Sequence, residues 1–210
     1  MLFYISRALF TILLKIMLKV RVFGRENLPE PPFIVASNHS SLMDPPLVGH
    51  ACSKYPVDFM AKQELFDMPL VGFWTRNVRC IPVKRGKNAV RGIKEAIRRL
   101  KKGHVVGIFP EGTRSGTGEL QQAKTGTGYL MVKSGVQVVP IYVYGTAKAF
   151  PTGKPIKMGT RVGAVIGKPI QPEEYLKEAG EEGKDYDKVS TLVMERIGRI
   201  KEGLDENLVG

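Results

Sequence analysis

The chain has 210 residues, of which 43% are hydrophobic and 25% charged, and this balance is typical of one globular domain with a full core. Its 32 Lys and Arg exceed its 20 Asp and Glu, so the formal net charge of +12 predicts an anionic partner: a lipid surface, a phosphorylated or acidic substrate, or a nucleic acid. Cys52 and Cys80 fit neither a metal site nor the disulfide framework of a secreted protein, which favours a reducing compartment.

The charge is distributed unevenly along the chain. Residues 1–25 contain five Lys or Arg and no acid, and residues 76–104 contain eleven Lys or Arg against the single acid Glu95. Residues 171–210 are acidic, with eleven Asp or Glu against six Lys or Arg. The basic stretch at 76–104 either meets the anionic partner or forms the solvated face of a helix.

The N-terminal segment predicts an amphipathic helix. Residues 2–18 are strongly apolar and lack Gly and Pro, while Arg7, Thr11, Lys15 and Lys19 recur every fourth residue and therefore share one helix face. A cation near the bilayer centre costs about 2.5–3.5 kcal/mol, so two cations disfavour a membrane span. A cationic stripe opposite a wide apolar face is typical of a helix that lies in the membrane interface. The alternatives are a single span, a helix packed on the protein's own core, and a cleaved signal peptide.

The rest of the chain predicts strands that alternate with helices. Short apolar runs predict buried strands at 33–37, 57–60, 80–83, 105–109, 136–144 and 161–166. Helices are expected at 45–52, 88–102, 127–133 and 185–205, and the apolar segment 64–75 is expected to face the membrane or the substrate. In the second of these helices the apolar face is expected to contain Val90, Ile93, Ile97 and Leu100.

This order of elements predicts an α/β sandwich around a mixed or mostly parallel sheet flanked by helices. We expect two parts in the chain. A membrane-associating helix occupies residues 1–24, and a single α/β domain occupies residues 25–210.

The first candidate site follows the strand at 33–37. Residues 38–45 read Asn-His-Ser-Ser-Leu-Met-Asp-Pro, in which His39 can take a proton from an alcohol while Asp44 holds its other ring nitrogen. Asp44 is also expected to cap the following helix, with Pro45 at its first position. No Gly-x-Ser-x-Gly elbow marks a nucleophilic serine, so the acceptor's own hydroxyl is the expected nucleophile. The alternative is that Asp44 is only a cap and His39 only a turn residue.

The second candidate site follows the strand at 105–109. Residues 109–115 read Phe-Pro-Glu-Gly-Thr-Arg-Ser, a glycine turn with one anion and one cation that suits a phosphate group. Alternatively, Glu111 and Arg114 only pair across the turn. Both sites follow the carboxyl end of a strand, where α/β folds usually place their ligands. In combination they predict acyl transfer to a hydroxyl of a phosphate-bearing acceptor.

These residues resemble the lysophosphatidic acid acyltransferase family, the PlsC-like glycerolipid acyltransferases. The family's Asn-His-x4-Asp motif is matched by Asn38, His39 and Asp44, and its Phe-Pro-Glu-Gly-Thr-Arg-Ser motif is matched at every position of 109–115. The family's other motifs correspond to residues 81–85, to Lys124 with Gly126, and to residues 138–141 around Pro140. The resemblance covers roughly residues 30–145 and implies the family's glycerolipid acyltransferase-like fold.

The resemblance implies a function and a role for each motif residue. The reaction would move a fatty acyl group from a thioester to the sn-2 hydroxyl of 1-acylglycerol 3-phosphate, giving phosphatidic acid, without a cofactor or a metal ion. His39 would be the general base and Asp44 would orient it. The residues that would bind the acceptor's glycerol phosphate are Lys84, Arg85, Glu111, Gly112, Thr113, Arg114 and Lys124.

The resemblance also implies partners and a location. The expected partners are lysophosphatidic acid, an acyl carrier protein or coenzyme A thioester, and an anionic membrane surface, without nucleic acid. The expected location is the cytoplasmic face of the cell membrane, as a monotopic or peripheral protein. One alternative is the same chemistry on glycerol 3-phosphate or another lysolipid. The other is a non-catalytic basic protein that binds an anionic membrane or a nucleic acid, although no nucleic-acid-binding module is recognisable.

Overall fold

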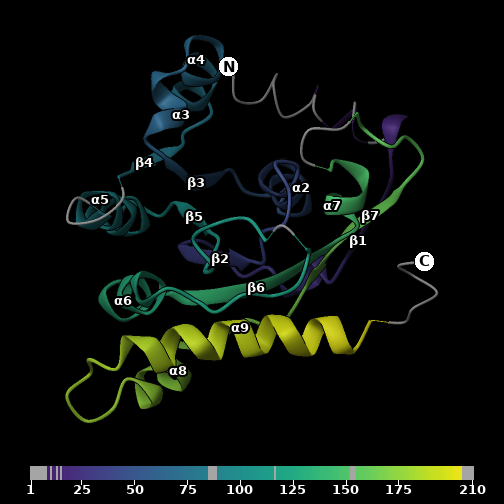
Figure 1. The fold of residues 1–210 in the computed structure, drawn as a ribbon. Helices are drawn as coiled ribbons and strands as arrows, with labels where there is room; N and C mark the ends of the chain where they lie inside the picture. The colour runs from purple at the N-terminus through teal and green to yellow at the C-terminus, as the bar shows by residue number, and fades with distance from the viewer. Residues whose placement is uncertain are drawn as a thin grey trace.

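A seven-stranded sheet runs through the centre of the described part of the chain (Figure 1). The computed structural model describes residues 9, 11, 12, 14, 16–84, 89–115, 117–151 and 155–204. The strands are β1 Lys19–Phe23, β2 Phe33–Ser37, β3 Val57–Lys62, β4 Ile81–Val83, β5 Val105–Ile108, β6 Gln137–Tyr144 and β7 Arg161–Ile166. Their spatial order is β1-β7-β6-β2-β5-β3-β4.

The sheet is mixed and mostly parallel, as the sequence predicts. The strands β6, β2, β5, β3 and β4 run parallel to their neighbours, whereas β7 is antiparallel to β6 and β1 is parallel to β7. Every residue of β2 and β5 is buried, which explains why these strands read as continuous apolar runs. Because five strands share a direction, the loops that follow them meet at one edge of the sheet.

Helices cover both faces of the sheet, as expected for an α/β sandwich. They are η1 Arg25–Asn27, α2 Asp44–Ala51, α3 Glu64–Asp67, α4 Pro69–Asn77, α5 Ala89–Lys101, α6 Thr125–Ser134, α7 Thr146–Ala149, α8 Pro172–Glu178 and α9 Tyr186–Glu202. Figure 1 shows α6, α8 and α9 along one face and α2 and α7 on the other. A separate hydrophobic core lies on each face of the sheet. One core contains Phe33, Leu47 and Val139, and the other contains Ile34 and Val193.

The first described residues form a helix that packs one face on the protein and exposes the opposite face. Residues 9, 11, 12, 14, 16 and 17 are helical. Leu14 is 2% exposed and Leu18 4% exposed, both within the core cluster that includes residues of β7. The apolar side chains exposed on the other side are Leu9, Ile12 and Ile16. Among the residues that the structure describes, no helix combines the length and apolarity needed to cross a membrane.

The structure describes two of the four residues of the predicted cationic stripe, Thr11 and Lys19. Arg7 and Lys15 lie outside the described residues. Thr11 faces the protein, with its hydroxyl 3.4 Å from Nδ1 of His50. The expectation that Lys19 continues the helix is wrong, because Lys19 begins β1, whose side chains alternate between exposed and half-buried as in an edge strand. The sheet therefore begins at residue 19, ahead of the expected boundary between residues 24 and 25.

The burial of α5 also differs in one respect from the expected pattern. Leu100 is buried and Ile93 packs against the core, as predicted, but Val90 is 46% exposed. The buried face is centred on Ala96, and the helix approaches β4 so closely at Gly92 that a Cβ there would lie 2.8 Å from a methyl of Val83. By the helical period, Val90 lies away from the face that carries Gly92 and Ala96. The short helices α7 and α8 were not predicted.

Candidate active site

The residues predicted as base and orienter are joined directly. His39 lies in the loop after β2, and Asp44 is the first residue of α2. Nδ1 of His39 lies 2.8 Å from Oδ2 of Asp44, and the His39 side chain is 16% exposed. With Nδ1 facing the carboxylate, Nε2 is the ring nitrogen that can accept a proton from a hydroxyl.

Asp44 is fully buried and its carboxylate faces back toward the loop that precedes it. Oδ2 accepts hydrogen bonds from the backbone amides of Ser40 at 2.6 Å and Ser41 at 2.7 Å. Oδ1 accepts a hydrogen bond from the hydroxyl of Thr146 at 2.6 Å. The prediction of Asp44 as helix cap is wrong, because Met43 occupies the N-cap position. The carboxylate of Asp44 instead accepts hydrogen bonds from the amides of the preceding loop. These donors hold the orienter in a single position.

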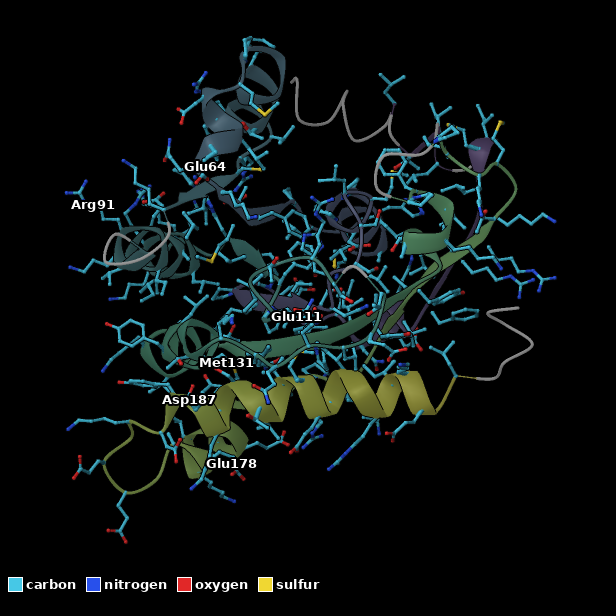
Figure 2. All side chains as sticks on the ribbon, in the orientation of Figure 1. Glu64, Arg91, Glu111, Met131, Glu178 and Asp187 are labelled. Carbon is cyan, nitrogen blue, oxygen red and sulfur yellow. The ribbon has the colours of Figure 1, made fainter. Side chains whose placement is uncertain are left out.

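The two motif blocks are bonded to each other through the backbone of His39. Its amide donates to Oε1 of Glu111 at 3.0 Å, and its carbonyl accepts from the amide of Ser115 at 2.7 Å. Glu111 is 1% exposed, and Figure 2 shows it in the interior of the molecule. Burial raises the pKa of the Glu111 carboxyl to about 7, opposed by the His39 amide and reinforced by the charge of Asp44. This geometry gives Glu111 a role in positioning the histidine loop.

Aromatic rings support the imidazole from one side. The His39 ring stacks on Phe109 with centroids 4.1 Å apart and an interplanar angle of 22°. Phe109 in turn stacks on Phe59, with centroids 5.9 Å apart. A stacked ring limits rotation of the imidazole, so the hydrogen bond to Asp44 and this stack define its orientation together.

Asn38, the first motif residue, ties the end of β2 to β6. Its side-chain amide donates to the carbonyl of Val143 at 2.9 Å, and its Oδ1 accepts from the amide of Val143 at 2.7 Å. The side chain therefore replaces the next rung of the β2–β6 ladder, and it fixes where the chain leaves the sheet toward His39.

The glycine turn of the second block has the shape that the sequence predicts. Gly112 has a φ of 67°, a left-handed conformation that favours glycine, and its amide donates to the carbonyl of Phe109. Thr113 and Arg114 are exposed at this turn. Lys124 is exposed beside it, since a Cβ on Gly112 would lie 3.1 Å from Cγ of Lys124. The structure thus gathers Gly112, Thr113, Arg114 and Lys124 into one accessible cationic turn.

The second predicted cation group lies elsewhere. Lys84 is exposed directly after β4. Two strands separate β4 from β2, which places Lys84 about 14 Å from the end of β2 across the sheet. Arg85 lies outside the described residues. The structure therefore does not bring Lys84 next to His39.

Sequence reasoning missed Thr146, which follows the carboxyl end of β6. Besides its bond to Asp44, its hydroxyl lies 3.1 Å from Oγ of Ser40. Ser40 also lines an open pocket of about 380 Å³ beside the site, with residues of β6 and Lys148. The signal for Thr146 was its place after a third strand that ends at the same edge as β2 and β5.

The chain is similar to a family model and to several proteins named as acyltransferases. A family model described as Acyltransferase matches residues 19–144. A chloroplastic 1-acyl-sn-glycerol-3-phosphate acyltransferase of Arabidopsis thaliana is 36% identical over 157 residues, 72% of this chain and 44% of the relative. A 1-acyl-sn-glycerol-3-phosphate acyltransferase of Bacillus subtilis is 29% identical over 188 residues, 89% of this chain and 90% of the relative.

A solved structure is similar over most of the fold. The crystal structure of the 1-acyl-sn-glycerophosphate acyltransferase PlsC from Thermotoga maritima matches with a TM-score of 0.70 and 33% sequence identity. The match covers 89% of this chain and 74% of the Thermotoga chain. The chain thus spans most of the Bacillus and Thermotoga proteins but less than half of the Arabidopsis relative.

Proposed function

The chain belongs to the acyltransferase family, and from this membership and the geometry of the site we propose that it acylates 1-acylglycerol 3-phosphate at the sn-2 hydroxyl. The acyl group comes from a thioester, and the product is phosphatidic acid. The observation that carries the proposal is the His39–Asp44 pair, with Nε2 available for a hydroxyl, in a loop bonded to the cationic turn at 112–114.

The proposed transfer is direct. Nε2 of His39 removes the proton of the acceptor hydroxyl as its oxygen attacks the thioester carbonyl carbon. The tetrahedral intermediate collapses, the carbon–sulfur bond breaks, and the thiolate takes the proton from Nε2 of the His39 imidazolium to leave as a thiol, which restores the neutral base. Asp44 holds the ring orientation and stabilises the imidazolium that forms in the first step.

The proposed acceptor site is the cationic turn. Arg114 and Lys124 supply positive charge for the acceptor's phosphate, and Gly112, which has no side chain, leaves the exposed backbone of the turn accessible to it. Glu111 is assigned a different role from the one that the family resemblance implied. Its buried carboxylate is bonded to the His39 amide, and a carboxylate beside a phosphate would repel it.

The proposed setting is the cytoplasmic face of the cell membrane. The exposed face formed by Leu9, Ile12 and Ile16 supports an interfacial position, because such a face buries apolar area in lipid without a span. The acyl donor in this proposal is an acyl carrier protein or coenzyme A thioester. Both donors are anionic, which suits the net charge of the chain.

The test is a transfer assay with the purified full chain. Radiolabelled lysophosphatidic acid is supplied with acyl-coenzyme A or with acyl carrier protein thioester, and labelled phosphatidic acid is measured. Glycerol 3-phosphate replaces the acceptor in parallel to test the alternative substrate. His39→Ala should lower turnover by about 10²–10⁴ while the protein stays folded by circular dichroism. Turnover near that of the natural chain in this variant would refute the mechanism.

A further inference from the structure

A second pocket lies at the edge of the sheet opposite the proposed active site. Its volume is about 380 Å³, and Asp58 lies at its base. The cationic side chains that line it are Arg76, Arg79, Arg98, Arg99, Lys102 and His104. Asp58 is near the start of β3, and His104 directly precedes β5. The active-site loops follow the ends of these parallel strands, so at least the length of β5, about 13 Å, separates the two sites.

A buried carboxylate organises the cations. Asp58 is fully buried, with Nε of Arg79 at 2.7 Å from Oδ1 and Nη1 of Arg99 at 2.9 Å from Oδ2. Nδ1 of His104 lies 3.1 Å from the same Oδ2. Each guanidinium group has five N–H donors. Asp58 binds both groups from the buried side and uses only some of these donors, so the others are left for a ligand in the pocket.

The backbone at Arg79 is consistent with a built site. Arg79 has a φ of 66°, and it is the non-glycine residue with a positive φ among those that the structure describes. A non-glycine residue keeps this conformation only where its surroundings hold it, and such residues cluster at ligand sites. The carbonyl of Arg79 accepts a hydrogen bond from Nη1 of Arg99, so the same guanidinium that binds Asp58 also fixes this turn.

The positive charge of the pocket exceeds what its own carboxylates neutralise. Asp58 faces Arg79 and Arg99, while Glu95 binds Arg98 through two hydrogen bonds of 2.7 and 2.6 Å and also binds Arg99. Without counting His104, the five Lys and Arg of the pocket face two carboxylates, a formal excess of three positive charges. Ion pairs that served only to stabilise the fold would not require this excess, and a concave, arginine-rich, cationic surface matches the oxygens of a phosphate.

We propose that this pocket is a binding site for a phosphate-bearing anion, separate from the site of acyl transfer. Arg79 and Arg99 form its rigid base, and Arg76, Arg98 and Lys102 close around the phosphate from the exposed rim. The phosphate is carried either by a soluble phosphate compound or by an anionic lipid headgroup. The proposal rests on this pocket alone and stands whether or not the acyl transfer proposed above is correct.

The test removes the rim and leaves the base intact. The variant Arg76→Gln, Arg98→Gln, Lys102→Gln keeps all three partners of Asp58. It loses the ion pair of Arg98 with Glu95 and the hydrogen bond from the Arg76 guanidinium to the carbonyl of Phe66, so circular dichroism first checks that the variant is folded. The matched control is Arg91→Gln, Lys94→Gln, Lys177→Gln, which removes three exposed charges outside the pocket; Figure 2 shows Arg91 pointing outward from α5. Calorimetry measures binding of adenosine 3′,5′-bisphosphate, and co-sedimentation measures binding to phosphatidylglycerol vesicles against phosphatidylcholine vesicles.

The rim variant should weaken one of the two interactions by about tenfold or more, since charge-assisted hydrogen bonds contribute about 1.5–3 kcal/mol each. The control should bind within about twofold of the natural chain, and His39→Ala should bind unchanged. Loss of bisphosphate binding assigns the site to a soluble phosphate, and loss of vesicle binding alone assigns it to a lipid headgroup. The proposal would be overturned if the rim variant and the control lost equal affinity for a probe, or if the rim variant lost affinity for neither. It would also be overturned if the natural chain bound an acidic protein through this pocket and bound neither probe.

Discussion

The backbone amide of His39 donates a hydrogen bond to the carboxylate of Glu111, a residue 72 positions later in the chain. The bond exists because β2 and β5 are parallel neighbours, so that the loops after both strands leave the sheet at the same edge. Two sequence blocks thereby become one site. The bond also makes the position of the proposed base depend on a residue of the block that carries the cationic turn.

Glu111→Gln should change how stability depends on pH. Burial raises the pKa of Glu111 from 4.5 to about 7, so the folded protein holds this proton more tightly than the unfolded chain does. The resulting stability is fully present below pH 4.5 and is lost as the pH rises through about 7. Glutamine keeps an acceptor for the His39 amide but cannot titrate. Between about pH 5 and about pH 8 the natural chain should therefore lose about 1–3 kcal/mol relative to the variant.

Urea unfolding of both proteins across this range measures that difference. Other titrating groups contribute equally to the two proteins and cancel. Stability curves that stay parallel would show that Glu111 is ionised throughout.

Asp44→Asn should lower kcat by about 10²–10⁴ and leave the KM for lysophosphatidic acid nearly unchanged. The amide keeps the volume of the side chain but cannot stabilise an imidazolium. The NH₂ group of the asparagine also replaces one acceptor oxygen, so it faces a group that donates to Asp44 in the natural chain: the amide of Ser40 or Ser41, or the hydroxyl of Thr146. Steady-state kinetics separate the two constants. An increase confined to KM would show that Asp44 shapes the acceptor site and has no part in the proton transfer.

Thr146→Val should destabilise the protein by about 1–3 kcal/mol and lower kcat, because it leaves Oδ1 of buried Asp44 without the Thr146 donor. Thr146→Ser is the matched control, since it retains the hydroxyl and removes only a methyl group. Thermal unfolding and turnover should place serine close to the natural protein. If serine and valine are equally damaging, packing of the methyl group is the role of Thr146.

Arg114→Ala should raise the KM for lysophosphatidic acid by about tenfold and change the KM for the thioester little, since the loss of one charged contact costs about 1.5 kcal/mol or more. Lys168→Ala serves as the control. Lys168 is also exposed, but it follows β7, which is antiparallel to β6 and therefore ends at the opposite edge of the sheet. A similar rise in both KM values would indicate that Arg114 supports the turn structurally.

Replacing Leu9, Ile12 and Ile16 with Ser should release the protein from phosphatidylglycerol vesicles. These side chains are 66%, 56% and 71% exposed, and burying each in lipid would contribute about 1.5–3 kcal/mol. Removing the whole segment is the poorer experiment, because it would also remove Leu14 and Leu18 from the core.

Co-sedimentation measures this release, and Val90→Ser with Leu176→Ser is the control for exposed apolar side chains elsewhere. Unchanged sedimentation of the N-terminal variant would place the membrane contact on another surface, such as α3 and α4.

Local sequence was sufficient to predict the strands and to predict that the proposed base, His39, contacts Asp44. The buried runs that became β2 and β5 are readable because a strand covered on both faces must be apolar throughout. His39 and Asp44 are five residues apart, so little beyond a tight loop is needed to join them. Arg114 was likewise predicted in an exposed turn, because the glycine turn is a local feature, whereas Lys124 was assigned to the same site only through the family resemblance.

The tertiary structure decided what depends on strand order and on contacts between distant segments. Strand order separates Lys84 from His39, and it brings Thr146 onto Asp44 across 102 positions. The edge strand that begins at Lys19 is stabilised by pairing with β7, which lies at the far end of the sequence. A sequence pattern reports which faces of an element are apolar, whereas the neighbours of that element depend on how all the elements pack. The sequence by itself therefore determined the residues capable of the chemistry, and packing determined which of them meet.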